Sequence, residues 1–490
     1  MMTTNQNTQT WEVELLTPLH IGDGVELRLN EDYISKAGAM DVIEFDSLLE
    51  SLSEYPLAIN DLGKTIDLQR LMKNYRINAP VRYSLPIKGV AVPNSIRRFL
   101  KNAYGQPFMA GSSLKGAIHT ALWTTLDKSR LPSPQKFRDF SAAVKSIGGK
   151  DPYHMFIRPL QISDSIGIEP GGALNCEEIK FFNLQMGNRP GWKDFKDKRT
   201  KDKFQDAAGL FVECLKPGIK LCLQAKLDCF LNSSNIKKAA GITECSDLSQ
   251  FQTLLQAMNA HSLHLATREQ AFFSGYKTET ASVMAFYDKL IYQIQALGQD
   301  SGTAFLRLSW GSGWRGMTGD WIDDDTLKEV RTQKKLGRTG VDIFPKTRRL
   351  AMDTQKGTPC LPLGWIRIQP IENKKFSLII NSAASTIPES SPQPPAVASV
   401  PTPPSDPEAE YQEKLTQFQN NVEKCRNFQG DIGRLAAIVN TQKDDRLKQA
   451  MCMVLKEKAE ALPKKAFTKA INENKSWATT LKMLFDANEC

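Results

Sequence analysis

The stretch from Phe108 to Leu126, FMAGSSLKGAIHTALWTTL, places small polar residues and a lysine just before a helical pattern. Gly111 allows a tight backbone approach, and Ser112 or Ser113 is expected to be the N-cap of the helix. Apolar residues then recur at helical spacing, at Leu114, Ala117, Ile118, Ala121, Leu122 and Leu126. The helix dipole, the unpaired N–H groups of the first turn and Lys115 would together attract a phosphate.

The same stretch also fits an ordinary capped helix with a solvated lysine, so the anion site remains one of two interpretations. It is not a Walker A loop, because Lys115 precedes Gly116 and no Ser or Thr directly follows the lysine.

A second candidate is the glycine-rich stretch WGSGWRGMTG at residues 310–319. Gly311 and Gly313 allow close backbone approach to a ligand, whereas Trp314 and Arg315 offer a stacking surface and a phosphate partner. The alternative is a glycine-rich turn with packed tryptophans.

Three further groups of residues could contact a polyanion. Arg97 and Arg98 could share a basic face with Lys115, or simply be solvated. The segment 330–349 is the densest basic run and includes Lys346, Arg348 and Arg349. In the insertion 187–204, Trp192 and Phe195 stand among basic residues, which favours either stacking on unpaired bases or a flexible charged loop.

A loop histidine follows the first expected strand. Trp11 to Leu16 alternates, with Trp11, Val13 and Leu15 on one face, and the turn-rich sequence LHIGDG comes next. His20 in this loop could stack on a base or contact a phosphate, or it could make a structural hydrogen bond.

Four stretches together resemble the RAMP superfamily, the repeat-associated proteins of CRISPR systems. GSSLKGAIHTAL resembles the signature G-S-S-[LI]-K-G-[AV]-[LI]-R-[TS], except that His119 stands where arginine is usual. LLTPLHIGDG at 15–24 and LSWGSGW at 308–314 resemble the first strand with its loop and the later glycine-rich loop. FPKTRRL at 344–350 and PLGWIRI at 362–368 are similar to the end of the Csm-type (III-A) branch, whose member caps the 3′ end of the crRNA.

The resemblance implies an α+β, tandem ferredoxin-like (RRM-like) RAMP fold with a β-hairpin insertion, the thumb, at 187–204. It implies crRNA and target RNA as partners, together with other protein subunits of the effector complex, especially an adjacent RAMP backbone subunit. No cofactor, metal or catalytic residue is expected. The expected RNA-binding residues are His20, Gly22, Arg97, Arg98, Gly111, Ser112, Ser113, Lys115, His119, Trp192, Phe195, Gly311, Gly313, Trp314, Arg315, Lys346, Arg348 and Arg349.

The composition of the chain is consistent with the expected RNA partners but does not prove them. The net charge of +9 is a mild basic excess, consistent with a polyanion partner. The nine cysteines include no CxxC pair, which gives a zinc site little support and favours buried reduced thiols of a cytosolic protein. No signal-peptide core or membrane-length apolar run occurs, so a cytoplasmic (prokaryotic) protein without membrane contact is expected.

The 490 residues are too many for one core, and composition changes along the chain. We expect a ferredoxin-like half with insertions at 1–240, a second half with the glycine-rich loop and basic run at 241–382, a disordered Pro/Ser-rich linker at 383–408, and a helical tail domain at 409–490.

Three functions are open at this point. The first is a non-catalytic crRNA-binding subunit that caps the 3′ end, supporting crRNA maturation and target RNA binding in antiviral defence. The second is a RAMP endoribonuclease that uses His20 or a loop carboxylate, Asp23 or Asp32, although His20 has no evident acid–base partner and a carboxylate alone would need a metal. The third is a protein-only assembly adaptor that acts through the helical tail.

Overall fold

The computed structural model describes residues 7–36, 38–53, 55, 67–89, 91–126, 128–136, 140–335, 343–353, 358–372, 407–423, 432, 435–436, 438–440, 444–460 and 476–487. The chain divides into two compact units, Met1–Ile387 and Pro388–Cys490. The predicted linker 383–408 lies outside the described residues except for its last two positions.

A five-stranded sheet forms the first layer of the larger unit. Its order is β13 (Ala304–Arg307), β16 (Trp365–Ile371), β1 (Thr8–Leu15), β12 (Lys220–Leu227) and β7 (Leu160–Ile162). The central strand β1 is antiparallel to both neighbours, so that Trp11 lies opposite Leu223 on one side and Pro370 on the other. Trp11 and Val13 are fully buried, as the alternation predicted. The sheet joins strands from both predicted halves, and the boundary at residue 240 stays a prediction.

The second sheet has eleven strands among the described residues and is built around the long strand β8 (Leu174–Leu184). Its main path is β2 (Gly22–Arg28), β6 (Ser95–Phe99), β11 (Leu210–Leu215), β8, β5 (Val81–Lys88), β4 (Ala39–Ile43) and β3 (Tyr33–Lys36). β8 also pairs with β14 (Thr347–Asp353), which pairs with β15 (Thr358–Pro362). The insertion forms a hairpin of β9 (Pro190–Lys193) and β10 (Thr200–Lys201), and β9 pairs with β8.

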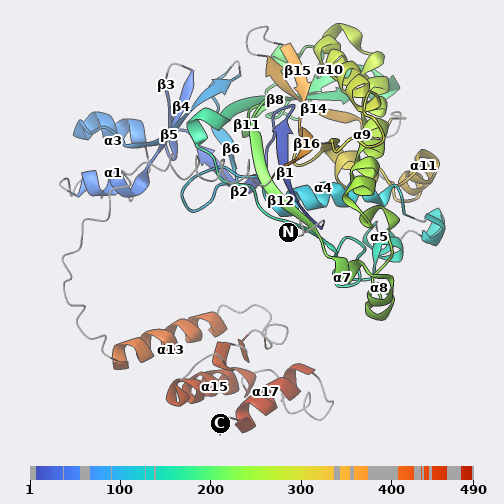
Figure 1. Cartoon of the computed structure of the whole chain (residues 1–490). Coiled ribbons are helices and arrows are strands. Elements are labelled where there is room, and N and C mark those ends of the chain that lie inside the picture. The colour runs from blue at the N-terminus through green and yellow to red at the C-terminus, as the bar shows by residue number, and fades with distance from the viewer. Residues whose placement is uncertain are drawn as a thin grey trace. The chain divides into compact units, whose positions relative to one another are not determined.

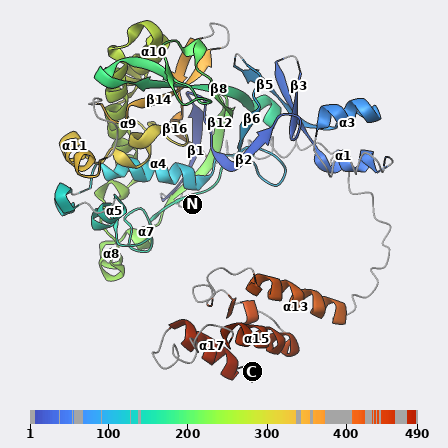
Figure 2. The ribbon, with the colours of Figure 1, turned by 180° about the vertical axis from the view of Figure 1, so that it is seen from behind.

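Two long helices, α9 (Phe251–Ser274) and α10 (Lys277–Gln295), run side by side beside the sheets (Figure 1). The apolar face of α9 continues through Leu265 and Phe273 into an aromatic core with Tyr287 and Trp365. The helix α4 (Gly111–Trp123) lies against α9, as the reverse view also shows (Figure 2).

The other described helices of this unit are short. They are α1 (Phe45–Leu52), α3 (Leu68–Tyr75), α5 (Phe140–Gly148), α6 (Pro170–Ala173), α7 (Cys229–Asn232), α8 (Ser234–Ala240) and α11 (Asp324–Gln333). Single 3₁₀ turns occur at Lys128–Arg130, Pro134–Lys136, Met186–Asn188, Phe204–Asp206 and Ser246–Leu248. A π-helical turn, η6, covers Arg315–Gly319.

The smaller unit is helical, with α13 (Pro407–Glu423), α15 (Asp445–Glu460) and α17 (Ser476–Ala487). These helices enclose a core of their own, which includes Phe418, Leu435, Met451, Leu455 and Leu481. The predicted α+β fold with a hairpin insertion and a helical C-terminal region is therefore confirmed. In the part of the chain that the structure describes, no helix is both long and apolar enough to cross a membrane.

Candidate nucleic-acid interface

The N-terminus of α4 already has an acidic partner. The helix begins at Gly111, its N-cap is Ala110, and no side-chain cap is present, so the predicted serine N-cap is wrong. Instead, the Asp164 carboxylate accepts a hydrogen bond from the Gly111 N–H at 2.8 Å. A Cβ at Gly111 would lie 2.4 Å from the Ile162 carbonyl oxygen. Glycine is therefore needed for close packing on the protein's own chain, and the carboxylate stands where a phosphate was expected.

Lys115 is directed away from this helix end. Its Nζ donates to the Leu160 carbonyl at 2.5 Å, and burial lowers its pKa. The ammonium is thus bound to the backbone at β7, and its part in a phosphate site with the serines stays a prediction.

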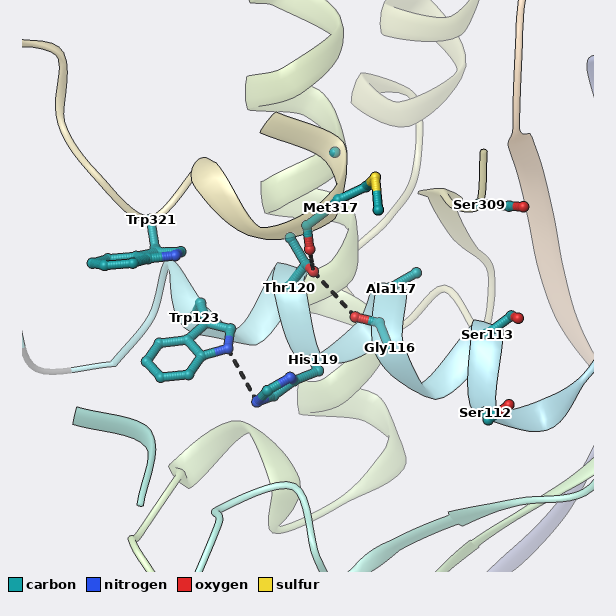
Figure 3. A pocket seen from close by; sticks show the side chains of 11 residues that line it. Ser112, Ser113, Gly116, Ala117, His119, Thr120, Trp123, Ser309, Met317 and Trp321 are labelled. Carbon is teal, nitrogen blue, oxygen red and sulfur yellow. Dashed lines mark hydrogen bonds between the residues drawn. The ribbon is translucent and has the colours of Figure 1, made fainter. Parts of the chain in front are cut away.

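A cavity of about 340 Å³ lies between α4 and the segment 309–321, and we call it the α4 cavity (Figure 3). Its wall on α4 includes Ser112, Ser113, Gly116, His119 and Trp123, and its opposite wall includes Ser309, Met317 and Trp321. The Thr120 hydroxyl bridges the two walls through the carbonyls of Gly116 and Met317. None of the described residues that line it is Asp, Glu, Lys or Arg.

His119 is the titratable group of the α4 cavity. Burial, and then the charge of Lys115, lowers its pKa to about 4. The Trp123 Nε1–H can only donate, so His119 Nε2, at 3.0 Å, accepts. At neutral pH the ring proton is therefore on Nδ1. The cavity thus contains a neutral histidine with one defined donor.

A second pocket of about 470 Å³, the Trp310 pocket, has Trp310, Arg97, Arg98 and Ser309 in its lining. The guanidinium groups of Arg97 and Arg349 lie 5.5 and 5.0 Å from the centroid of the Trp310 ring. We call Arg97, Trp310 and Arg349 the Trp310 cluster. Trp310 was not among the predicted contact residues. The signal in the sequence that could have identified it is its position at the start of the glycine-rich stretch.

The arginines of the Trp310 pocket and Arg349 of the neighbouring Trp310 cluster differ in how their charges are compensated. Arg98 pairs with Asp23 at 2.7 Å, and Arg97 lies 3.6 Å from Glu26. Within the described part of the chain, no carboxylate lies within 4.0 Å of the Arg349 guanidinium. Burial, and then the positive charges of Arg97 and Arg307, lowers the pKa of Arg349. An anion bound at Arg349 would stabilise a cation that stacks on aromatic rings and has no carboxylate partner among the described residues.

His20 is structural rather than exposed. Its side chain is buried, its Nδ1 lies 2.7 Å from the Glu213 carbonyl oxygen, and burial lowers its pKa. A Cβ at Gly22 would lie 2.9 Å from His20 Nε2, so the glycine makes room for the imidazole. These contacts match the structural alternative, but His20 also lines the Trp310 pocket, and its contact with a base or phosphate stays a prediction.

The glycine-rich stretch is partly a packed turn. Gly311 and Gly313 have φ of +99° and +80°, which glycine adopts without strain. A Cβ at Gly311 would clash with Leu363, whereas Gly313 faces open space. Arg315 was predicted to bind phosphate, but it is buried and pairs with Asp324 at 2.5 Å and Asp320 at 3.5 Å.

Trp314 packs on Phe344 with ring centroids 5.3 Å apart. This contact matches the alternative in which the tryptophans of the stretch are packed. The ring is only partly buried, so a role in stacking stays a prediction.

The basic run also contains a paired arginine. Arg348 Nε lies 2.7 and 2.8 Å from the two carboxylate oxygens of Glu269, and its guanidinium stacks 4.0 Å over Phe272. Its charge is therefore compensated within the protein, and its assignment as an RNA contact stays a prediction. Lys346 is half-buried, and its carbonyl accepts from the Leu184 N–H. Residues 336–342 of the run lie outside the described residues.

The two aromatic residues of the insertion differ. Trp192 is fully buried and packs against Phe182, so the prediction that it is accessible for stacking was wrong. Phe182 lies on β8, outside the insertion, so the sequence of the insertion alone could not show this contact. Phe195 is 45% exposed and stacks on Phe181, which leaves it accessible.

The first unit therefore combines α+β layers with loops that carry arginine and tryptophan side chains. More particularly, residues 12–227 match the family model described as the RAMP superfamily. None of the curated proteins matches the sequence.

Two solved structures resemble the chain. One belongs to a cryo-EM structure of a Csm–crRNA–target RNA ternary complex of a type III-A CRISPR–Cas system, with a TM-score of 0.51, 21% identity, and coverage of 74% of this chain and 100% of the other. The other is the crystal structure of Csm5 from T. onnurineus, with a TM-score of 0.45, 18% identity, and coverage of 72% and 99%. At 21% identity, the similarity to the chain of the ternary complex shows a shared fold.

Proposed function

We propose that the protein is a crRNA-binding structural subunit of a type III-A CRISPR ribonucleoprotein effector complex. In this proposal it caps the 3′ end of the crRNA and supports crRNA maturation and target RNA binding in antiviral defence, in the prokaryotic cytoplasm. The RAMP match and the fold shared with a chain of a crRNA–target RNA complex support the class.

The observation that carries the proposal is the Trp310 cluster. Two guanidinium groups flank one indole, and Arg349 has no carboxylate within 4.0 Å among the described residues. Cations bind phosphates whatever base is attached, so the cluster suits the backbone of single-stranded RNA without sequence preference. Binding should weaken steeply with salt, because each neutralised phosphate releases counterions.

A non-catalytic role is part of the proposal. His20 is held by the Glu213 carbonyl, and Asp23 is held by Arg98. Asp32 accepts from the Arg28 N–H at 2.7 Å. These contacts do not favour the endoribonuclease alternative, because each candidate group already has a structural partner. The helical unit is proposed to dock on a neighbouring protein subunit, which includes the adaptor role within the same function.

The test is to purify the effector complex with and without this subunit and to sequence the crRNA 3′ ends. Loss of the subunit should give shorter or heterogeneous 3′ ends, and the purified protein with Mg²⁺ should leave target RNA intact. Uniform crRNA ends in both preparations would contradict capping. Cleavage that is abolished by Asp23→Ala or Asp32→Ala would instead establish the nuclease alternative.

A further inference from the structure

We propose that the α4 cavity binds one unpaired nucleobase of an RNA strand while the adjoining phosphate lies against the Trp310 cluster. The inference rests on the proposed function and assigns a nucleotide site within it. Ser112 and Ser113, which the sequence analysis assigned to a phosphate site, line the cavity that takes the uncharged part of the nucleotide.

The lining of the α4 cavity selects against a phosphate. It contains no Asp, Glu, Lys or Arg among the described residues, and His119 is neutral at pH 7. A phosphate moved into this space would lose its water without gaining a counter-charge. A base is planar, uncharged and rimmed with polar atoms, so it suits a pocket with tryptophan and methionine walls and a few hydroxyl groups.

Two polar features could orient the base. The His119 Nδ1–H is the one donor that the Trp123 hydrogen bond leaves on the imidazole. The hydroxyl groups of Ser112 and Ser113, near the opposite end of the cavity, can donate or accept (Figure 3). Hydroxyl groups adapt to different base edges, which agrees with binding that does not select one sequence.

The position of the cavity supplies the phosphate partner. Ser309 lines both the α4 cavity and the Trp310 pocket, so the uncharged space and the arginines adjoin at a single residue. A nucleotide has the same arrangement, with its base and its phosphate on different sides of one ribose.

Ser309 is held in an unusual conformation at this junction. Its φ is +73°, a region that few residues other than glycine adopt. Its hydroxyl donates to the His20 carbonyl, and its own carbonyl accepts from the Ser312 hydroxyl at 2.7 Å. Strain of this kind persists where surrounding contacts fix it, and it is concentrated at ligand sites.

Gly116→Leu is the sharpest variant. Gly116 lines the cavity, and no heavy atom lies within 4 Å of a Cβ built there. A leucine side chain therefore fits without a clash, but it occupies the space that the base would fill. Leucine also favours a helix interior more than glycine does, so the variant should unfold at or above the wild-type temperature. Gly275→Leu is the matched control, because its Cβ also meets nothing within 4 Å and it ends α9 outside both pockets.

The probes are a 12-nucleotide uridine RNA and an abasic ribose-phosphate strand of the same length, titrated against the full chain. We expect the wild type and Gly275→Leu to bind the uridine strand about tenfold more tightly than the abasic strand, since stacking of one base is worth that order. Gly116→Leu should bring this ratio close to one and leave abasic binding unchanged.

The outcomes separate the two proposals. A wild-type ratio near one, or an unchanged ratio in Gly116→Leu, overturns the base site and leaves RNA binding intact. Failure of the wild type to bind either strand overturns the proposed function itself. If Gly116→Leu melts below the wild type, Ser113→Leu fills the same cavity from the first turn of α4, and the same ratio decides.

Discussion

Replacing Arg349 by methionine should weaken RNA binding without destabilising the protein, and its neighbour Arg348 should behave in the opposite way. Arg349 is stacked on Trp310 and lies in the positive field of Arg97 and Arg307, so its removal costs no ion pair with a described carboxylate. Loss of one charge-assisted contact to phosphate costs about 1.5–3 kcal/mol, which is roughly a 10- to 150-fold change in Kd.

Arg348→Met is the matched control. It removes Arg348 as the partner of both carboxylate oxygens of Glu269, whose side chain is 4% exposed. Among the described residues, Arg307 at 3.6 Å is then the remaining cation beside Glu269. Uncovering a buried carboxylate in this way costs about 3 kcal/mol of unfolding free energy. RNA affinity of the folded variant should stay near the wild-type value, because Arg348 is already neutralised.

The assay combines fluorescence anisotropy with labelled single-stranded RNA at several salt concentrations and urea denaturation of the free protein. For Arg349→Met, the slope of log K against log salt should become shallower by about 0.7, the value for one phosphate on a single strand. If Arg348→Met lost more affinity than Arg349→Met, or if Arg349→Met left both affinity and salt slope unchanged, the assignment of the Trp310 cluster would be refuted.

Three other predictions concern stability. The pKa of His119 is about 4 in the folded protein, below the 6.5 of a free histidine, so its contribution to stability is fully present above pH 6.5 and is lost as the pH falls towards 4. Urea denaturation should show a loss of about 3 kcal/mol, and a wild type as stable at pH 4 as at pH 7 would contradict this. Asp164→Ala removes the acceptor of the Gly111 N–H and should cost about 1 kcal/mol, whereas equal stability would show that the contact is dispensable. Trp192→Ala should cost about 3–5 kcal/mol of unfolding free energy because the ring is fully buried. Phe195→Ala should change the melting temperature little and reduce RNA binding, and equal losses of stability in the two variants would disprove the distinction between a buried and an accessible ring.

Local patterns predicted the elements better than they predicted the contacts of charged groups. The alternation around Trp11 and Val13 identifies a buried strand, because the strand period alone determines which face is covered. The helix after Gly111 was equally clear from its apolar spacing. Its cap was not, since Asp164 comes from a loop more than fifty positions further along the chain.

The basic residues show why the site was only partly predictable. Arg348 and Arg349 are adjacent in sequence, yet one is paired with Glu269 and the other is stacked on Trp310. Which side of a strand faces an acidic helix position depends on tertiary packing. The pattern identified a basic run, but the difference between a structural and an accessible arginine arises only in the folded protein.

The pairing of β1 with β16 has a consequence for synthesis of the chain. Thr10 pairs with Ile371, so the central strand of the sheet lacks one neighbour until nearly the whole first unit has been translated. At about 5–20 residues per second, that interval is tens of seconds, during which one edge of an apolar strand is open to other nascent chains. Fragments that end before Trp365 would keep this edge permanently, and we expect them to aggregate.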